Sequence, residues 1–190
     1  MTVPLEVPAR RFWGESMSSL LGIMLGSWEA RDRALDAQGW TGRRVLGMKI
    51  PDWQRAEVWT HDQEARFIES VYLGAGLGQY MLNDHSDQAL SDIVIDGQQR
   101  LLALQHYWTD RFGIPGEDGK TRLWSDLNPD IGHARLLRIS FPYLMTRYGS
   151  EALMQDAYNR HNGGGTPHRP EDMAPHAADL MSERPGMLPR

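Results

Sequence analysis

The stretch "SDIVIDGQQRLLALQHYW", residues 91–108, determines most of what the sequence says about the fold. Ile93 to Ile95 are the β-branched, apolar residues of a short buried strand. From Leu101 to Trp108, leucines and aromatic residues recur at the spacing of a helix face. Residues 96–100, Asp-Gly-Gln-Gln-Arg, stand between the two patterns. The sequence predicts a strand that leads directly into a helix, and the polar junction is either a mere turn or a binding loop at the mouth of a pocket.

The residues upstream of this stretch predict a second strand and a second helix. A short strand around Val45 to Ile50 is expected to end at Pro51, because proline lacks the N–H group that a strand ladder needs. Thr60 followed by Gln63 has the spacing of a capping box at a helix N-terminus. The apolar residues that follow predict a helix to about residue 73, ended by the glycines of 74–78.

The remaining elements are predicted from periodicity and from turn residues. We expect an arm over 1–14, a helix over 16–35 that is broken near Gly22 and Gly26, and strands over 79–84 and 91–96 joined by a polar turn. Downstream we expect a loop over 113–120, a strand over 134–142 ending at Pro142, a helix over 150–161 and a weak last helix over 170–181.

These elements predict an α+β fold, because strands and helices mix around a central hairpin without strict βαβ alternation. The expected organisation is an N-terminal arm and helix over 1–44, a main domain over 45–172 and a C-terminal tail over 173–190.

Composition excludes several classes of protein. No apolar run approaches the roughly 18–20 residues of a membrane helix, and the N-terminus lacks the apolar core of a signal peptide, so no membrane association is expected. The chain has no cysteine, which favours a reducing interior compartment. Its net charge of −5 argues against a cationic nucleic-acid binder. Only Lys49 and Lys120 are lysines among 20 basic residues; this bias suits phosphate recognition, but a GC-rich genome also explains it.

Three polar loops are candidates for one binding site: 51–55 (Pro-Asp-Trp-Gln-Arg), 96–100 and 162–168 (Asn-Gly-Gly-Gly-Thr-Pro-His). A helix N-terminus beside a glycine binds anions through its backbone N–H groups, and a neighbouring arginine can clamp the same phosphate. Consecutive glycines let backbone amides approach a ligand closely. Each loop alone is also explained as ordinary turn chemistry or as a flexible link.

The segments "IPDWQRAEVWTHDQEARFIESVYLG" and "VIDGQQRLLALQHYW", followed by "YNRHNGGGTPH", resemble the DGQQR-motif family represented by the N-terminal half of GmrSD-type modification-dependent restriction enzymes. That family is assigned to the ParB/sulfiredoxin-like superfamily. The resemblance covers roughly residues 45–172 and implies a ParB/sulfiredoxin-like mixed sheet flanked by helices. It also implies a domain that binds a nucleoside triphosphate, often hydrolyses it, and works on or with DNA in the cytoplasm of a bacterial or phage-infected cell.

The resemblance assigns roles to particular residues. Arg55 and Arg100 are expected to clamp phosphates, with Gln54, Gly97, Gln98 and Gln99 completing the nucleotide site. Asp96 is the expected Mg²⁺ ligand or general base, because Mg²⁺ is held by one or two carboxylates together with phosphate oxygens. Glu57 is a second candidate base, with a solvated strand residue as the alternative. The third loop is expected to contribute Asn162, Gly163, Gly164 and Thr166 to phosphate or ribose.

Two classes of function remain open at this point. One is an enzyme, an NTPase or a kinase, that transfers the terminal phosphoryl group to water or to a hydroxyl, in DNA modification or restriction, including a phage-encoded factor. The other is a non-catalytic nucleotide-binding module that acts with a separate nuclease or modification enzyme. The nuclease half of the restriction enzymes does not follow the third motif, so the chain is not expected to cut DNA by itself. No P-loop motif is present.

Overall fold

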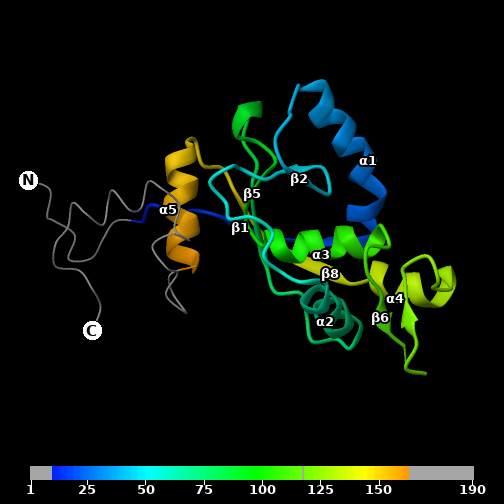
Figure 1. Ribbon diagram of the computed structural model, residues 1–190. Coiled ribbons are helices and arrows are strands. Elements are labelled where there is room, and N and C mark those ends of the chain that lie inside the picture. Colours follow the sequence, from blue (N-terminus) through cyan, green and yellow to red (C-terminus); the bar gives the residue numbers. More distant parts are fainter. Residues whose placement is uncertain (1–9, 117, 163–190) are drawn as a thin grey trace, which may run out of the picture.

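The computed structural model describes residues 10–116 and 118–162, and its centre is a six-stranded mixed sheet (Figure 1). The strand order is β1-β8-β4-β5-β3-β2. The strands are β1 (Glu15–Leu20), β2 (Arg44–Val45), β3 (Met48–Lys49), β4 (Tyr80–Asn83), β5 (Ile93–Asp96) and β8 (Ser140–Thr146). β5 pairs antiparallel with β4 and parallel with β3, and β4 pairs parallel with β8. The predicted α+β class is confirmed.

Helices cover both faces of this sheet. They are α1 (Leu21–Ala37), α2 (His61–Tyr72), α3 (Gln98–Trp108), α4 (Ala134–Leu137) and α5 (Glu151–Asn162). A short 3₁₀ helix (Gln88–Leu90), a π turn (Pro129–His133) and the small hairpin β6 (Ile114–Pro115) and β7 (Thr121–Arg122) complete the described elements. None of the helices in this part of the chain has the length and apolar character needed to span a membrane.

The alternation of side chains along β5 divides the core in two. Val94 belongs to the larger cluster, which includes residues of α1 to α4. Ile93 and Ile95 point to the opposite face, where they join Met154 and Tyr158 of α5. α5 therefore packs on one face of the sheet alone, as Figure 1 shows, while α3 is enclosed within the other layer.

The elements around the two motifs form as the sequence predicts because their signals are local. α2 begins with the predicted capping box: the Thr60 N–H donates to Gln63 Oε1 at 2.8 Å, and the Gln63 N–H donates to Thr60 Oγ1 at 3.4 Å. β5 leads through Gly97 directly into α3. The predicted pairing of residues 79–84 with 91–96 is confirmed as the antiparallel pair β4 and β5.

The N-terminal prediction is wrong in two respects. Residues 15–20 form β1, which pairs antiparallel with β8 from Glu15 to Leu20, instead of the first turn of a helix. α1 then runs without a break through Gly22 and Gly26. At Gly22 a Cβ would lie 3.1 Å from the carbonyl oxygen of Leu137, so glycine here lets α1 approach the end of α4. Strand pairing and close packing between distant segments decide both features.

Three further boundaries differ from the prediction. Residues 44–49 form a tight hairpin, β2 and β3, whose turn residues Leu46 and Gly47 have φ values of 49° and 72°. The loop expected over 113–120 contains β6. Residues 134–137 are helical, and β8 continues through Pro142 to residue 146. Pro142 is tolerated because β4 pairs with β8 only from Tyr143 onward, so at Pro142 the strand has β1 as its single neighbour. The helix expected over 170–181 lies outside the described residues.

Candidate functional site

A pocket of about 400 Å³ opens where β5 ends and α3 begins. Segments far apart in the sequence contribute to it: the loop 51–60, the residue before β4, the turn 96–100 and the last turn of α5. The pocket thus brings the first predicted loop, the second and the start of the third to one place. It is lined by Gln54, Arg55, Trp59, Gln79, Asp96, Gly97, Gln98, Gln99, Arg100, Tyr158, His161 and Asn162.

Gly97 makes the sharp turn between β5 and α3 feasible. Its φ of +92° lies in the left-handed region, and a Cβ at this position would stand 2.5 Å from the Cβ of Tyr80. Burial of the Tyr80 ring against this turn raises the pKa of its phenol. As the N-cap, Gly97 offers no side chain to the first turn of α3. The opening of α3 therefore has the features of an anion site.

Asp96 and Arg100 form an ion pair across this turn. Arg100 Nη2 lies 3.3 Å from Asp96 Oδ2 and also donates to the carbonyl oxygen of Gln79. His161 Nε2 of α5 approaches the same Oδ2 at 3.6 Å. Asp96 is therefore placed between a guanidinium and an imidazole, and its side chain is only 18% exposed. Arg100 Nε is buried without a hydrogen-bond partner in the described part of the chain.

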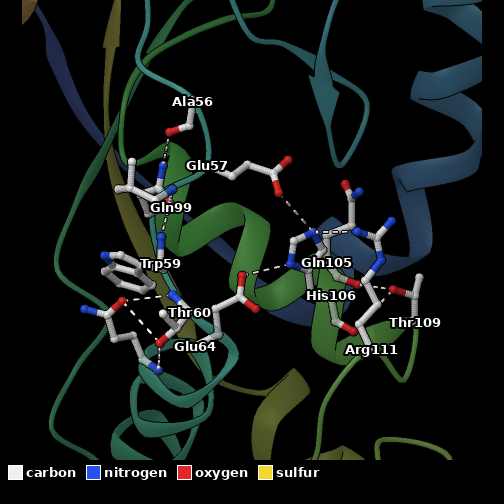
Figure 2. Close-up of polar contacts among 12 residues, drawn as sticks. Ala56, Glu57, Trp59, Thr60, Glu64, Gln99, Gln105, His106, Thr109 and Arg111 are labelled. Atoms are coloured by element: carbon white, nitrogen blue, oxygen red, sulfur yellow. Dashed lines mark hydrogen bonds and ion pairs between the residues drawn. The ribbon is translucent and has the colours of Figure 1, made fainter. Parts of the chain in front are cut away.

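Two of the predicted glutamines bind the protein backbone. Gln99 Oε1 accepts from the N–H groups of Val58 and Trp59 at 3.1 and 3.2 Å, and its Nε2 donates to the Ala56 carbonyl at 3.2 Å (Figure 2). Gln54 Nε2 donates to the carbonyl of Ile95 at 2.9 Å and to that of Val94. Both side chains line the pocket, and their amides fix the loop 51–60 against β5 and α3.

Gln98 differs from these two glutamines in its hydrogen bonding. Its side chain is buried, with 4% of the residue exposed, yet neither Nε2 nor Oε1 has a partner among the described residues. An unpaired buried amide costs stability, so such groups are exceptions that call for an explanation. Gln98 lines the pocket, so a turn of its side chain toward that space would let a ligand supply the missing partners.

Arg55 is exposed at the rim of the pocket, and a second arginine determines where it stands. Arg43 donates to the carbonyl oxygens of Pro51 and Gln54 at 2.8 Å each and to that of Arg55 at 3.2 Å. Nothing in the sequence indicates this role, since Arg43 precedes the motif and stands in an unremarkable Arg-Arg pair. The arginine that shapes the loop is therefore distinct from the arginine that faces the pocket.

α5 supplies the remaining wall of the pocket through Tyr158, His161 and Asn162. Tyr158 packs edge-on against Trp53 with ring centroids 5.5 Å apart, and Asn162 Nδ2 donates to the Tyr158 carbonyl at 3.0 Å. His161 was not among the predicted site residues, because its partner Asp96 lies 65 positions earlier and no spacing signals the contact. The predicted Gly163, Gly164 and Thr166 lie outside the described residues.

Glu57 lies away from the pocket. Its carboxylate points toward the other end of α3, where Oε2 is 3.9 Å from His106 Nε2 (Figure 2). His106 Nδ1 is 2.8 Å from Glu64 Oε1, and Arg111 Nη1 is 3.0 Å from His106 Nε2. The structure therefore separates Glu57 from Asp96, Arg100 and the other predicted site residues.

The pocket offers a metal ion one carboxylate ligand. Asp96 is the one acidic residue among those that line the pocket, and no cluster of three or more acidic or histidine side chains suited to a metal occurs in the described ranges. One carboxylate fits a Mg²⁺ ion that arrives already bound to phosphate oxygens, since Mg²⁺ takes few protein ligands in nucleotide sites.

Comparison with known protein families identifies the family to which the chain belongs. The sequence model described as "GmrSD restriction endonuclease, N-terminal domain" matches residues 38–162. The chain belongs to this family. The match confirms the resemblance of the DGQQR segment and places the chain in a restriction-modification, DNA-related context. No curated protein matches the chain, and no solved structure matches it. The residues that line the pocket fall within the GmrSD N-terminal match, whereas β1 and α1 precede it.

Proposed function

We propose that the chain binds a nucleoside triphosphate in the pocket at the start of α3 and transfers its terminal phosphoryl group, to water or to a hydroxyl, in work on or with DNA. One observation carries the proposal: the uncapped N-terminus of α3, Arg55 and Arg100 meet at one pocket of about 400 Å³. That size is in the usual range for small-molecule and cofactor sites. The six-stranded sheet with helices on both faces is, on this proposal, a ParB/sulfiredoxin-like fold.

Phosphoryl transfer is mainly a matter of position and charge, and the pocket residues supply both. The backbone N–H groups at the start of α3 and the guanidinium of Arg55 would bind phosphate oxygens. Asp96 would hold Mg²⁺, which screens phosphate charge when it is bound. Arg100, tied to Asp96 and to the carbonyl of Gln79, would keep that carboxylate in place.

The proposal is tested with the Arg55→Ala variant, because Arg55 is exposed and its removal leaves no buried charge behind. Removal of a charge-assisted hydrogen bond of about 1.5–3 kcal/mol weakens binding of the nucleotide roughly 10- to 100-fold. Arg33→Ala is the matched control, since Arg33 is 72% exposed and its salt bridge to Glu29 lies on α1. The measurement is calorimetric binding of ATP, GTP, CTP and UTP with Mg²⁺. No binding of any of the four to the wild type at millimolar concentration would refute the proposal.

The fate of the phosphate distinguishes the enzyme from the alternative function. With γ-³²P-labelled nucleotide, release of phosphate or labelling of DNA identifies phosphoryl transfer. Nucleotide binding without any product, on DNA or on small hydroxyl compounds, identifies a binding module acting with a separate nuclease or modification enzyme. One observation favours this second function: Asp96 is already contacted by Arg100 and His161, so the described residues of the pocket offer no unpaired carboxylate as a base.

A further inference from the structure

A second hollow, of about 290 Å³, lies beside the start of α5, whereas the nucleotide pocket lies beside the last turns of that helix. Arg11, Trp13 and Glu15 line the hollow from the segment that leads into β1, and Arg147 and Leu153 line it from the end of β8 and the start of α5. In Figure 1 the chain before β1 passes beside α5, in agreement with the contact between Arg11 and Asp156. Residues 10–15 precede the GmrSD N-terminal match, so the family assigns nothing to them.

A buried carboxylate holds two of the arginines on this surface. Asp156 of α5, with a side chain only 7% exposed, accepts from Arg160 Nε at 2.9 Å and lies 3.6 Å from Arg11 Nη2. Both guanidinium groups also lie over the ring of Phe12, at 5.8 Å for Arg11 and 5.6 Å for Arg160. Their side chains are nonetheless 59% and 62% exposed. The two positive charges are thus fixed in position and open to a ligand.

The neighbouring indole of Trp13 is exposed to an unusual degree for tryptophan. It is 61% exposed, and the guanidinium of Arg10 stacks over it at 4.1 Å. Arg147 stands on the same hollow and pairs with Glu15, but both partners are more than half exposed, so solvent screens this pair. Of the four guanidinium groups, those of Arg11, Arg147 and Arg160 pair with two carboxylates, and that of Arg10 stacks on the exposed Trp13 ring. This surface therefore carries more arginines than carboxylates directly paired with them, in a chain whose net charge is −5.

We propose that this arginine-tryptophan surface, formed by Arg10, Arg11, Trp13, Arg147 and Arg160, binds single-stranded DNA. Exposed guanidinium groups recognise phosphates, and an exposed aromatic ring stacks on an unpaired base. A base within an intact duplex has both faces covered, so the free face of Trp13 selects a single strand. The surface borders the nucleotide pocket, because Arg160 belongs to it and the next residue, His161, lines the pocket.

The test measures fluorescence anisotropy of a labelled 20-nucleotide oligothymidine at low salt, with no nucleoside triphosphate present. Its result therefore stands whatever the nucleotide pocket does. Trp13→Ala is expected to weaken binding about 5- to 100-fold, and Trp13→Phe to restore most of it. Because the indole is exposed, its removal leaves the core intact, which circular dichroism verifies.

The arginine contribution is tested separately. Arg147→Gln is expected to weaken binding and to reduce the slope of log K against log salt by about 0.7, because one phosphate is no longer neutralised. Arg33→Gln, an equal change of charge on α1, is expected to bind as the wild type does. Absence of oligonucleotide binding by the wild type, equal affinity of Trp13→Ala and wild type, or equal behaviour of Arg147→Gln and Arg33→Gln would each overturn the proposal. So would duplex binding at least as tight as single-strand binding.

Discussion

The two ends of α3 carry polar clusters of similar composition, and they differ in whether their residues border a ligand-sized pocket. At the C-terminal end, His106 contacts both Glu64 and Arg111 (Figure 2). Nearby, Gln105 Oε1 accepts from the Leu46 N–H at 2.8 Å. His106 and Glu64 are 5% and 3% exposed, and neither lines the 400 Å³ pocket or the 290 Å³ hollow described above. This end joins α3 to α2 and to the β2–β3 hairpin.

The N-terminal end has the opposite character. Its residues line a pocket of about 400 Å³, the opening turn of α3 has no side-chain cap, and the amide of Gln98 is buried without partners in the described part of the chain. The difference teaches that residue types alone do not locate a site. Glutamine, arginine and an acidic side chain occur at both ends, and the end with unmet hydrogen-bonding groups beside a pocket is the one prepared for a ligand.

We call the C-terminal end of α3, around His106, the closed end, and the N-terminal end, around Gln98, the open end. The largest expected effect is on stability, at the closed end. His106→Ala leaves Glu64 buried without the partner at 2.8 Å, and its Oε2 already lacks one among the described residues. Breaking such a buried pair lowers the free energy of unfolding by about 3–5 kcal/mol, measured by urea denaturation. Nucleotide binding by the fraction that remains folded is expected to be unchanged.

A double variant provides the control for that prediction. Glu64→Met combined with His106→Phe replaces both polar groups by apolar ones of similar size, and is expected to recover most of the stability. Arg111 is exposed, so water can satisfy its guanidinium in the double variant. A decrease below about 1 kcal/mol in His106→Ala would show that the two ends of α3 do not differ in the way described.

The second prediction concerns Gln99, which holds the loop 51–60 from the open end. Gln99→Ala removes partners from two backbone N–H groups and one carbonyl and is expected to lower the free energy of unfolding by about 2 kcal/mol. Because Arg55 and Trp59 belong to that loop, nucleotide affinity should fall as well. Gln99→Glu keeps the acceptor and removes the donor, so its free energy of unfolding should lie between those of the wild type and Gln99→Ala. A fall in stability with unchanged nucleotide affinity would show that the loop 51–60 does not contribute to nucleotide binding.

A third, smaller effect is expected at Thr60, where the same loop enters α2. Thr60→Ala removes the capping box and is expected to cost about 1 kcal/mol, with Thr60→Ser restoring most of it. Nucleotide affinity should not change, because Gln99 and Arg43 fix the pocket side of the loop. Calorimetric unfolding and nucleotide titration of the same samples compare the two quantities. A drop in affinity at Thr60→Ala would show that the cap also positions the pocket.

The features that the sequence predicted correctly depend on contacts within a few residues. The capping box joins residues three apart, and the strand, turn and helix of 93–108 follow one another without interruption. β1 and the continuation of β8 beyond Pro142 escaped prediction because their stability comes from pairing between distant segments, 130 residues apart for Glu15 and Met145. The local pattern of 134–142 contains no sign of that partner.

The sequence predicted where the candidate site lies, but not which hydrogen bonds each of its residues makes. The DGQQR motif and the upstream Gln-Arg pair predicted a common pocket, and the structure brings both to it together with Asn162. Which glutamine bonds to the backbone and which remains unpaired depends on the path of the loop 51–60, which the sequence does not show. Glu57 was expected at the same site because it follows Arg55 by two residues, yet it lies beside His106.

The smallest effect on stability is expected at Gln98, and it should have the opposite sign to its effect on binding. Gln98→Met keeps the length of the side chain and removes two buried polar atoms that lack partners in the described ranges, so stability should stay equal or rise by up to about 1 kcal/mol. If the amide serves the ligand, nucleotide affinity should fall in the same variant. Its neighbour Gln99 provides the contrast, because there stability and affinity should fall together. Denaturation and nucleotide titration of both variants decide the matter. A destabilised Gln98→Met protein with unchanged affinity would mean that the Gln98 amide has structural partners and is not available to a ligand.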